Sequence, residues 1–376
     1  FLAATGASLP FAWWFCGAEV AASSLFRWLL LGQALLIYLL IRGGAEAAES
    51  RLERRMFAVL LVAALLSAAY GIVDFAQPVP LPHPAADQFI WLRGAVLRRA
   101  QGVFYESSNF ANFCGFFLAA VSAILLAREK RVWDIPSPLL LLAIAILGLA
   151  VLVAFSRSAW ASVLTTVIVF VCVSRRVAAR RAAVFLAALA IPILGLWLYS
   201  PELWDYLVNA RVGYLAQILS DPNMASSGRV ETWQRMFSIL QDYPRYLAFG
   251  TGYRTLPYTR LFHDQLIPDN GYLSLLLETG VVGLGAFLAF TWAILRTFWT
   301  LHKRVGPLGF WSALLFSFWC GECVQLLAAD AHTYWRNMIV FAAFMALALN
   351  RAEREQALPS NLARSFAAGN KGQATP

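Results

Sequence analysis

Long apolar runs recur along this chain, and one polar stretch interrupts them after residue 199. Runs of about 17 to 25 apolar residues can cross the roughly 30 Å hydrocarbon core of a bilayer as helices. About ten stretches qualify, at residues 1–22, 25–41, 56–75, 104–127, 138–155, 159–174, 182–199, 271–298, 308–328 and 334–349. The pattern predicts an all-α polytopic membrane protein with about 10 transmembrane helices.

The same pattern divides the chain into four parts. Residues 1–199 form an N-terminal transmembrane bundle, and residues 200–270 a long polar loop that contains amphipathic helices. Residues 271–350 form the C-terminal transmembrane helices, and residues 351–376 a tail whose Ala, Ser, Gly and Asn content is typical of disorder. Phe1 falls inside an apolar run, so we expect further residues to precede it in the full protein.

The composition excludes a soluble domain. Hydrophobic residues make up 60% of the chain and charged residues only 14%, too few to cover a soluble surface. All five cysteines fall in apolar runs, where Cys acts as a small hydrophobe. The pair Cys320 and Cys323 has no second Cys pair or neighbouring His, and the four histidines are scattered. We therefore expect no metal, no cofactor and no nucleic-acid partner.

The distribution of Lys and Arg orients the spans. One set of connections is strongly basic, which makes that side cytoplasmic and places both termini there. Its basic residues are Arg42, Arg51, Arg54, Arg55, Arg128, Lys130, Arg131, Arg175, Arg176, Arg180, Arg181, Arg296, Lys303, Arg304 and those of the tail from Arg351. The other side carries the loops at 76–99 and 200–270, with tight turns near Ser24, Arg157 and Asp330.

Every basic residue on the outer side is an arginine, whereas all three lysines fall on the cytoplasmic side. The planar guanidinium group suits bidentate contact with phosphate, which lysine cannot make. A high-GC genome is an alternative explanation, because arginines greatly outnumber lysines throughout the chain. The first explanation predicts an anionic ligand on the outer side.

Two outer arginine sites precede the long loop. Arg98 and Arg99 lead into a polar and aromatic segment at 102–113, which contains Asn109 and whose alternative role is to anchor the chain at the interface. Arg157 sits between two spans with almost no loop. An arginine at that depth is costly unless it is paired or meets an anion, so we favour function over a snorkelling side chain.

The long loop holds a third arginine site and ends in a polar junction. Arg229 falls in the first turn of an amphipathic helix predicted after Gly228, where free N–H groups favour an anion. The alternative is a surface helix with a solvated arginine. The chain re-enters the membrane through Asp269 and Asn270. At the helical rise of about 1.5 Å per residue, Glu278 lies about 13 Å deeper in the membrane than Asp269. We favour a structural role for Glu278.

These pieces together resemble the O-antigen ligase and O-antigen polymerase superfamily. The resemblance covers most of the chain from Arg93 to Phe344, including the long outer loop before the last spans. The matching stretches are residues 102–113, Ser156-Arg157-Ser158, Gly228-Arg229 with Trp233 four residues on, Phe249-Gly-Thr-Gly-Tyr253, and Asp269-Asn270 followed by Gly280-Val-Val-Gly283.

The resemblance implies a metal-independent glycosyltransferase of the bacterial inner membrane, with its active site facing the periplasm. Such enzymes move a glycan from undecaprenyl pyrophosphate to an acceptor. In ligases the acceptor is a lipid A core sugar, and in polymerases of O-antigen or exopolysaccharide it is a carrier-linked glycan. We adopt the ligase as the first interpretation and the polymerase as its alternative.

The resemblance also implies roles for residues. Arg157 and Arg229, with Arg98 and Arg99, would hold the pyrophosphate, and Asp269 would activate the acceptor hydroxyl. Typical ligases have His where this chain has Asp269, a departure that weakens the ligase interpretation relative to the polymerase. His263, six residues earlier, is the alternative base. The helix N-terminus would lower the pKa of Asp269. The further candidates are Asn270, Asn109, Glu278 and Tyr253.

A secondary transporter or lipid flippase is the alternative from another class. In such a protein Glu278 and Glu322, inside predicted spans, would be coupling residues. Transporters tend to contain paired repeats with matching interrupted spans, and the sequence shows no internal repeat. The charges also gather at the outer surface rather than at the midplane, which favours the enzyme.

Overall fold

The computed structural model describes residues 1–44, 49–77, 89–92, 95–127, 135–174, 179–206, 208, 220–226, 228–259 and 267–357. Within these residues the regular structure is helical apart from one short hairpin. Strand β1 (Phe89–Leu92) pairs antiparallel with β2 (Ala95–Arg98), with Phe89 opposite Arg98. The prediction of an all-α membrane protein is confirmed, and the hairpin lies in the predicted outer loop at 76–99.

Nine long helices make up the described bundle. They are α3 (Ala18–Gly44), α4 (Glu49–Ala76), α5 (Ser107–Leu126), α6 (Ser137–Val153), α7 (Arg157–Ser174), α8 (Ala179–Tyr199), α13 (Gly271–Leu301), α14 (Pro307–Gln325) and α15 (Trp335–Ala357). The shorter helices are α1 (Leu2–Gly6), α2 (Leu9–Cys16), α9 (Pro201–Tyr206), α11 (Pro222–Ala225), α12 (Arg229–Asp242), η3 (Pro244–Tyr246) and η4 (Ala331–Thr333).

Five helices of the described chain are long and apolar enough to cross a membrane, namely α3, α4, α5, α7 and α13. Helix α6 and the apolar part of α8 are shorter than this criterion requires. Nine of the ten predicted spans each fall on one of the long helices. The full number of crossings stays a prediction, because length and composition support five of them.

The first predicted span, residues 1–22, is wrong. Pro10 stands near the start of α2, and Gly17 adopts φ 87° directly after its end, so the apolar run breaks into α1, α2 and the beginning of α3. The predicted turn near Ser24 is also wrong, because Ser24 lies within α3, where its hydroxyl donates to the Tyr253 carbonyl. Ser8 accepts a hydrogen bond from the Tyr253 amide, so the start of α2 lies against the polar segment.

Helix α5 is the centre of the bundle. Its apolar window is 89% buried, whereas that of α3 is 6% buried. A helix that is apolar on every side suits a central position, since each face meets another helix. Helix α5 packs against α6 and α7, α7 packs against α14, α14 packs against α13, and α3 packs against α15. Aromatic side chains fill the centre, with Phe116 edge-on to Phe318 and Phe344 stacked on Trp311.

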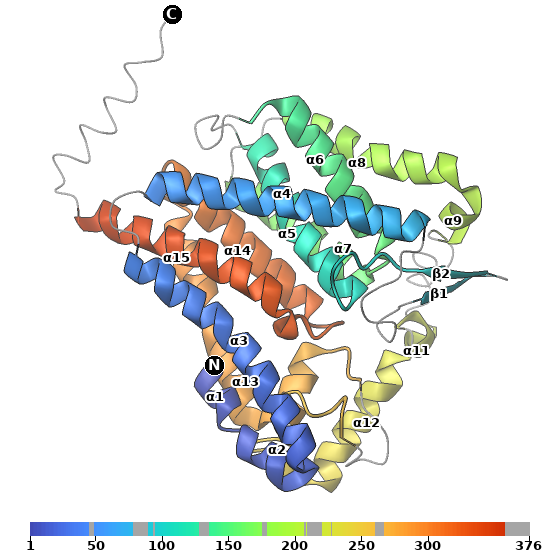
Figure 1. Cartoon of the computed structure of the whole chain (residues 1–376), viewed down its shortest axis with the longest axis vertical. Helices are drawn as coiled ribbons and strands as arrows, with labels where there is room; N and C mark the ends of the chain where they lie inside the picture. The colour runs from blue at the N-terminus through green and yellow to red at the C-terminus, as the bar shows by residue number, and fades with distance from the viewer. Residues whose placement is uncertain are drawn as a thin grey trace, which may run out of the picture.

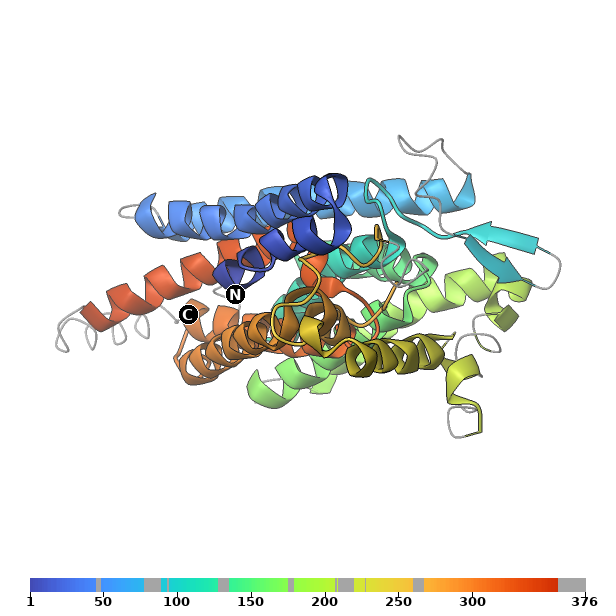
Figure 2. The same cartoon turned by 90° about the horizontal axis from the view of Figure 1, so that it is seen from below.

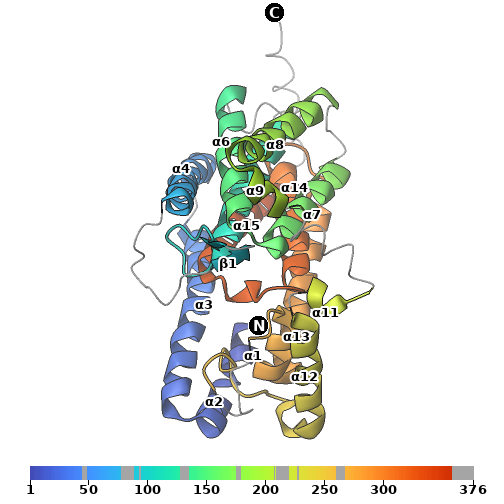
Figure 3. The ribbon, with the colours of Figure 1, turned by 90° about the vertical axis from the view of Figure 1, so that its right-hand side faces the viewer.

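The short helices and strands of the loops at 76–99 and 200–270 lie at one end of the bundle. In Figure 1, β1, β2, α9 and α11 lie at the right, away from the end of α15 and the start of α4 at the left. Figure 2 keeps the hairpin at the right, and Figure 3 looks onto this end. The predicted tight turns are confirmed at residues 154–156, between α6 and α7, and at 326–334, between α14 and α15.

Candidate functional site

The junction between the polar segment and α13 is a capped helix start. The Asn270 side chain accepts hydrogen bonds from the Tyr272 and Leu273 amides, each at 3.1 Å, as an N-cap residue does. Asp269 before it has φ 45°, a left-handed conformation that is uncommon outside glycine. Next to it, the Pro268 carbonyl accepts a hydrogen bond from the Trp233 indole at 3.0 Å. Asn270 therefore has a structural role.

Helix α12 brings Arg229 to this junction. As predicted, the helix begins at Arg229, following Gly228 in a left-handed conformation, and Ser226 Oγ accepts from the Val230 amide. The Arg229 guanidinium donates to Asp269 Oδ2 from Nε at 3.2 Å and from Nη2 at 3.1 Å. The two side chains are 26% and 46% exposed. Residues 40 positions apart therefore form one solvent-accessible pair.

A second, buried ion pair braces the same region. Arg254 Nη1 lies 3.0 Å from Asp330 Oδ2, and these side chains are only 15% and 10% exposed. Asp330 Oδ1 also accepts from the Ser274 hydroxyl at 2.6 Å. The contacts join the loop after α12, the first turn of α13 and the turn between α14 and α15. They hold the start of α13, and with it Asp269, in place.

The electrostatics of the junction differ from the sequence-based expectation. Burial raises the pKa of Asp269, the nearby Asp330 adds to the rise, and Arg229 opposes it. The predicted lowering by the helix N-terminus is therefore wrong, because Asn270 occupies the capping position and Asp269 is partly dehydrated among other acids. Burial also raises the pKa of Glu106, which interacts with both aspartates, and Arg254 opposes that rise. An aspartate with a raised pKa is a stronger base.

The Phe249–Tyr253 turn docks onto a break in α13. Gly280 has φ 67° and ψ −171° inside the helix, and a Cβ there would lie 2.1 Å from the Ala248 carbonyl oxygen. The chain before Tyr253 satisfies the backbone groups that the break frees, since Val281 donates to the Leu247 carbonyl at 2.8 Å and Gly252 to the Glu278 carbonyl at 2.8 Å. Two motifs of the sequence analysis thus form one packed unit.

Both acids proposed as coupling residues of a transporter have hydrogen-bond partners. The Glu278 carboxylate accepts from the Arg254 amide at 2.8 Å and from the Leu256 amide at 3.2 Å, which is the structural role favoured above. Glu322 accepts from the Asn112 side chain, which also donates to Gln325 at 2.7 Å. Glu278 therefore fixes the loop to the helix break, and Glu322 belongs to a buried polar cluster.

The remaining arginine candidates lie on the same end of the bundle. Arg98 is buried, and its Nη1 lies 3.2 Å from Asp74 Oδ1, which gives it a structural partner. Arg99 donates to the Ala154 carbonyl at 2.9 Å and lowers the pKa of Asp269, so it lies near the junction. Arg157 is the first residue of α7 and is half-buried. Pyrophosphate binding by these residues, and by Arg229, stays a prediction.

The other candidates have structural surroundings or lie outside the described chain. Asn109 is buried in the first turn of α5, and its carbonyl accepts from Asn337 at 3.4 Å. Tyr253 is fully buried, with its backbone bonded to Ser8 and Ser24. His263 falls outside the described residues, so its proposed role as the alternative base stays a prediction.

Three residues of the site were missed as chemical candidates. Arg254, Asp330 and Glu106 interact with one another and, in the case of both acids, with Asp269. Arg254 directly follows a motif used above, and Asp330 lies in a turn that was predicted as a turn only. Their spacing carries no signal, because tertiary packing of distant segments brings them together. Within the described chain, no three His, Cys, Asp or Glu side chains are grouped as metal ligands.

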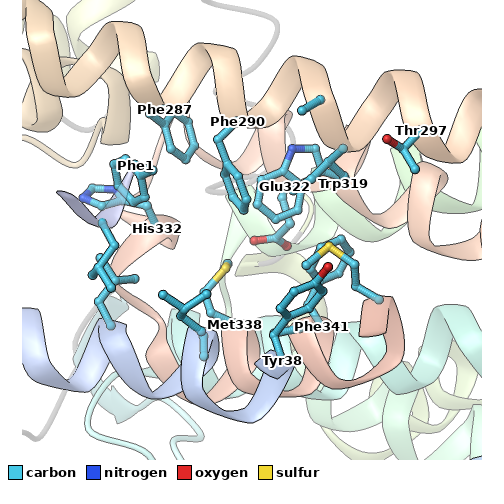
Figure 4. Close-up of a pocket in the computed structure, with 18 of the residues that line it drawn as sticks. Phe1, Tyr38, Phe287, Phe290, Thr297, Trp319, Glu322, His332, Met338 and Phe341 are labelled. Carbon is cyan, nitrogen blue, oxygen red and sulfur yellow. The ribbon is translucent and has the colours of Figure 1, made fainter. Parts of the chain in front are cut away.

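An apolar cavity of about 570 Å³ reaches from the bundle to this junction. Figure 4 shows Phe287 and Phe290 of α13 facing Met338 and Phe341 across the cavity, with Glu322 between them. At its outer end the lining includes Leu326 and His332, and a Cβ on Gly271 would lie 2.3 Å and 3.0 Å from these side chains. Two side chains of the cavity wall therefore adjoin Gly271, which follows Asp269 by two residues.

Comparison with known proteins gives one family match. Residues 139–288 match the family model described as O-Antigen ligase. This range runs from α6 through the polar segment and past the break in α13, so it contains Arg157, Arg229 and Asp269. The resemblance inferred from the sequence is confirmed. No curated protein matches the chain significantly.

Proposed function

We propose, from the match of residues 139–288 to the O-antigen ligase family model, that this chain transfers a glycan from undecaprenyl pyrophosphate to an acceptor sugar, with lipid A core as the first candidate acceptor. The observation that carries the proposal is the solvent-accessible Arg229–Asp269 pair at the start of α13. The pair places a guanidinium group, which can bind phosphate, beside a carboxylate that can accept a proton. We place the reaction at the periplasmic face of the inner membrane, because the basic residues of the sequence assign the opposite face to the cytoplasm.

In the proposed reaction, the acceptor hydroxyl oxygen attacks the anomeric carbon of the donor. The bond from that carbon to the pyrophosphate oxygen breaks, and the electron pair leaves with the pyrophosphate. The hydroxyl proton moves to Asp269. Both contacts from Arg229 end on Oδ2, which leaves Oδ1 to receive the proton. The raised pKa of Asp269 suits this role, because a carboxylate held at very low pKa would be a poor base.

The arginines would stabilise the leaving group. Pyrophosphate gains negative charge as the bond breaks, and preorganised guanidinium groups at the membrane surface offset that charge without a metal. Arg229 already pairs with a carboxylate, so a pyrophosphate bound there would compete with Asp269 for it. Donor binding would thereby release Asp269 for the acceptor hydroxyl. We propose that Arg157, Arg98 and Arg99 supply the rest of the positive charge around the pyrophosphate.

The apolar cavity would hold part of the carrier tail. Its walls are mainly aromatic and aliphatic, and its volume of about 570 Å³ is in the range of small-molecule sites. Because it ends beside Gly271, a tail bound there would leave the pyrophosphate near Asp269 and Arg229. Apolar side chains alone are sufficient to bind a hydrocarbon chain.

A transfer assay with purified protein tests the proposal. The donor is a glycan on undecaprenyl pyrophosphate, offered with lipid A core or with a second carrier-linked glycan, in the presence and absence of EDTA. We expect product with at least one acceptor and no effect of EDTA. Asp242→Asn, an exposed acid at the far end of α12, is the matched control for Asp269→Asn and should keep full activity. Transfer that needs magnesium or manganese would refute the arginine mechanism.

A further inference from the structure

A second crevice lies at the opposite end of the bundle from Asp269. It has a volume of about 870 Å³ and lies between α7, α13 and α14. The connection from α13 to α14 forms its mouth and contributes His302, Lys303 and Arg304. This connection is one of the lysine-bearing ones, on the side away from the polar segment. The proposed glycan transfer uses none of these residues.

The mouth of the crevice is built for an anion. Lys303 and Arg304 line it, and no acidic side chain is among the described residues that do so. Glu355 of α15 interacts with Arg304 and offsets part of that charge. Gly306, the N-cap of α14, and Gly309 in its first turn also line the mouth, where the positive end of the helix dipole adds to the charge of the two basic side chains.

Two polar side-chain atoms at the mouth have no hydrogen-bond partner among the described residues. They are Ser174 Oγ, at the end of α7, and His302 Nδ1, two shielded atoms of half-buried residues. Trp299 stands beside them, with its ring 4.8 Å from that of His302 and with the Lys303 ammonium 5.9 Å from its centroid. Trp is enriched at the headgroup level of bilayers, which places the mouth at the membrane interface.

The body of the crevice is apolar and has the depth of one leaflet. Along α14 its lining runs from Gly309 to Cys320, which at 1.5 Å per residue is about 16 Å. Half of the roughly 30 Å hydrocarbon core is about 15 Å. Ile168 and Cys172 of α7 and Phe316 of α14 line this part. A free phosphate would use only the mouth, whereas a phospholipid would fill both parts.

We propose that this crevice binds one anionic phospholipid, with its phosphate at Lys303, Arg304 and the start of α14, and with one acyl chain between α7 and α14. Basic pockets between transmembrane helices at this level are suited to anionic headgroups. The site is independent of the proposed glycan transfer, since it rests on the crevice and on the membrane position of the helices. It would anchor the α13–α14 connection to lipid of that leaflet.

Native mass spectrometry of the full chain in detergent tests the proposal, with phosphatidylglycerol as the anionic probe and phosphatidylcholine as the zwitterionic one. We expect one phosphatidylglycerol bound more tightly than any phosphatidylcholine. The double variant Lys303→Gln/Arg304→Gln should weaken its binding about 10- to 30-fold. The matched control Arg54→Gln/Arg55→Gln removes the same charge at exposed positions on the same side and should bind as the wild type does.

A second variant tests the apolar part without changing any charge. Cys172→Trp places a large side chain in the crevice and should also weaken phosphatidylglycerol binding, while the exposed position of Cys172 should leave the fold intact. Equal affinity for the two lipids, or unchanged binding in the Lys303 and Arg304 variant, would overturn the proposal. Displacement of the lipid by millimolar inorganic phosphate would also overturn it, because the acyl chain would then contribute nothing.

Discussion

Two arginine–aspartate pairs stand near the start of α13, and they differ chiefly in exposure. The Arg254–Asp330 pair is 15% and 10% exposed and receives a further hydrogen bond from Ser274. The Arg229–Asp269 pair is 26% and 46% exposed, and both of its hydrogen bonds end on one carboxylate oxygen. A buried pair is costly to break, whereas an exposed pair contributes little to stability and can exchange partners. The buried pair therefore serves the fold, and the exposed pair is available for chemistry.

Breaking the buried pair should have the largest effect on stability. Arg254→Met leaves the Asp330 charge buried without its partner, and we expect a loss of about 3–5 kcal/mol in the free energy of unfolding. Arg229→Met is the matched variant of the exposed pair and should cost less than about 1 kcal/mol. Thermal unfolding of both variants and the wild type in detergent measures the two losses of stability. Similar losses in the two variants would remove the distinction between the pairs.

A substitution at the break in α13 should destabilise the protein nearly as much as breaking the buried ion pair. Gly280→Ala adds a Cβ at φ 67° and against the Ala248 carbonyl oxygen, so we expect a loss of about 1–3 kcal/mol. Gly285→Ala is the control, because the same helix offers open space at that position. Alanine is favoured over glycine in a helix by up to about 1 kcal/mol. A Gly280→Ala protein as stable as the Gly285→Ala protein would contradict the docking of the Tyr253 turn.

The exposed pair should control the acid side of the pH profile. Asp269 must be deprotonated to accept a proton, so transfer falls as the pH drops through its pKa, which the partial burial of this side chain raises. Arg229 opposes that rise, and Arg229→Gln should therefore move the acid limb to higher pH. Arg235→Gln, an exposed arginine of the same helix, should leave the limb where it is. The check is the pH dependence of transfer, with each profile normalised to its own maximum.

The fold was predictable where local pattern determines it. The nine long helices follow apolar runs, and the start of α12 after Gly228 follows from the residues there. The prediction of one span over residues 1–22 was wrong, although the sequence shows Pro10 and Glu19 inside that run, because the chain breaks at Gly17 and forms separate short helices. Contacts between distant segments, such as Arg254 with Asp330, leave no local pattern in a single sequence. The direction of the pKa shift of Asp269 was predicted wrongly for the same reason, since the burial that raises this pKa, and the nearby Asp330 that adds to the rise, come from tertiary packing.

The most direct test of the central claim compares Asp269→Asn with His263→Ala in the transfer assay. Both variants are measured at saturating donor and acceptor, with binding of the donor lipid measured separately. We predict that Asp269→Asn slows transfer by about 10² or more while donor binding persists, because the substitution removes the proton acceptor. His263→Ala should cost much less. The reverse result would contradict the account, moving the base to His263 and leaving Asp269 as a partner of Arg229 only.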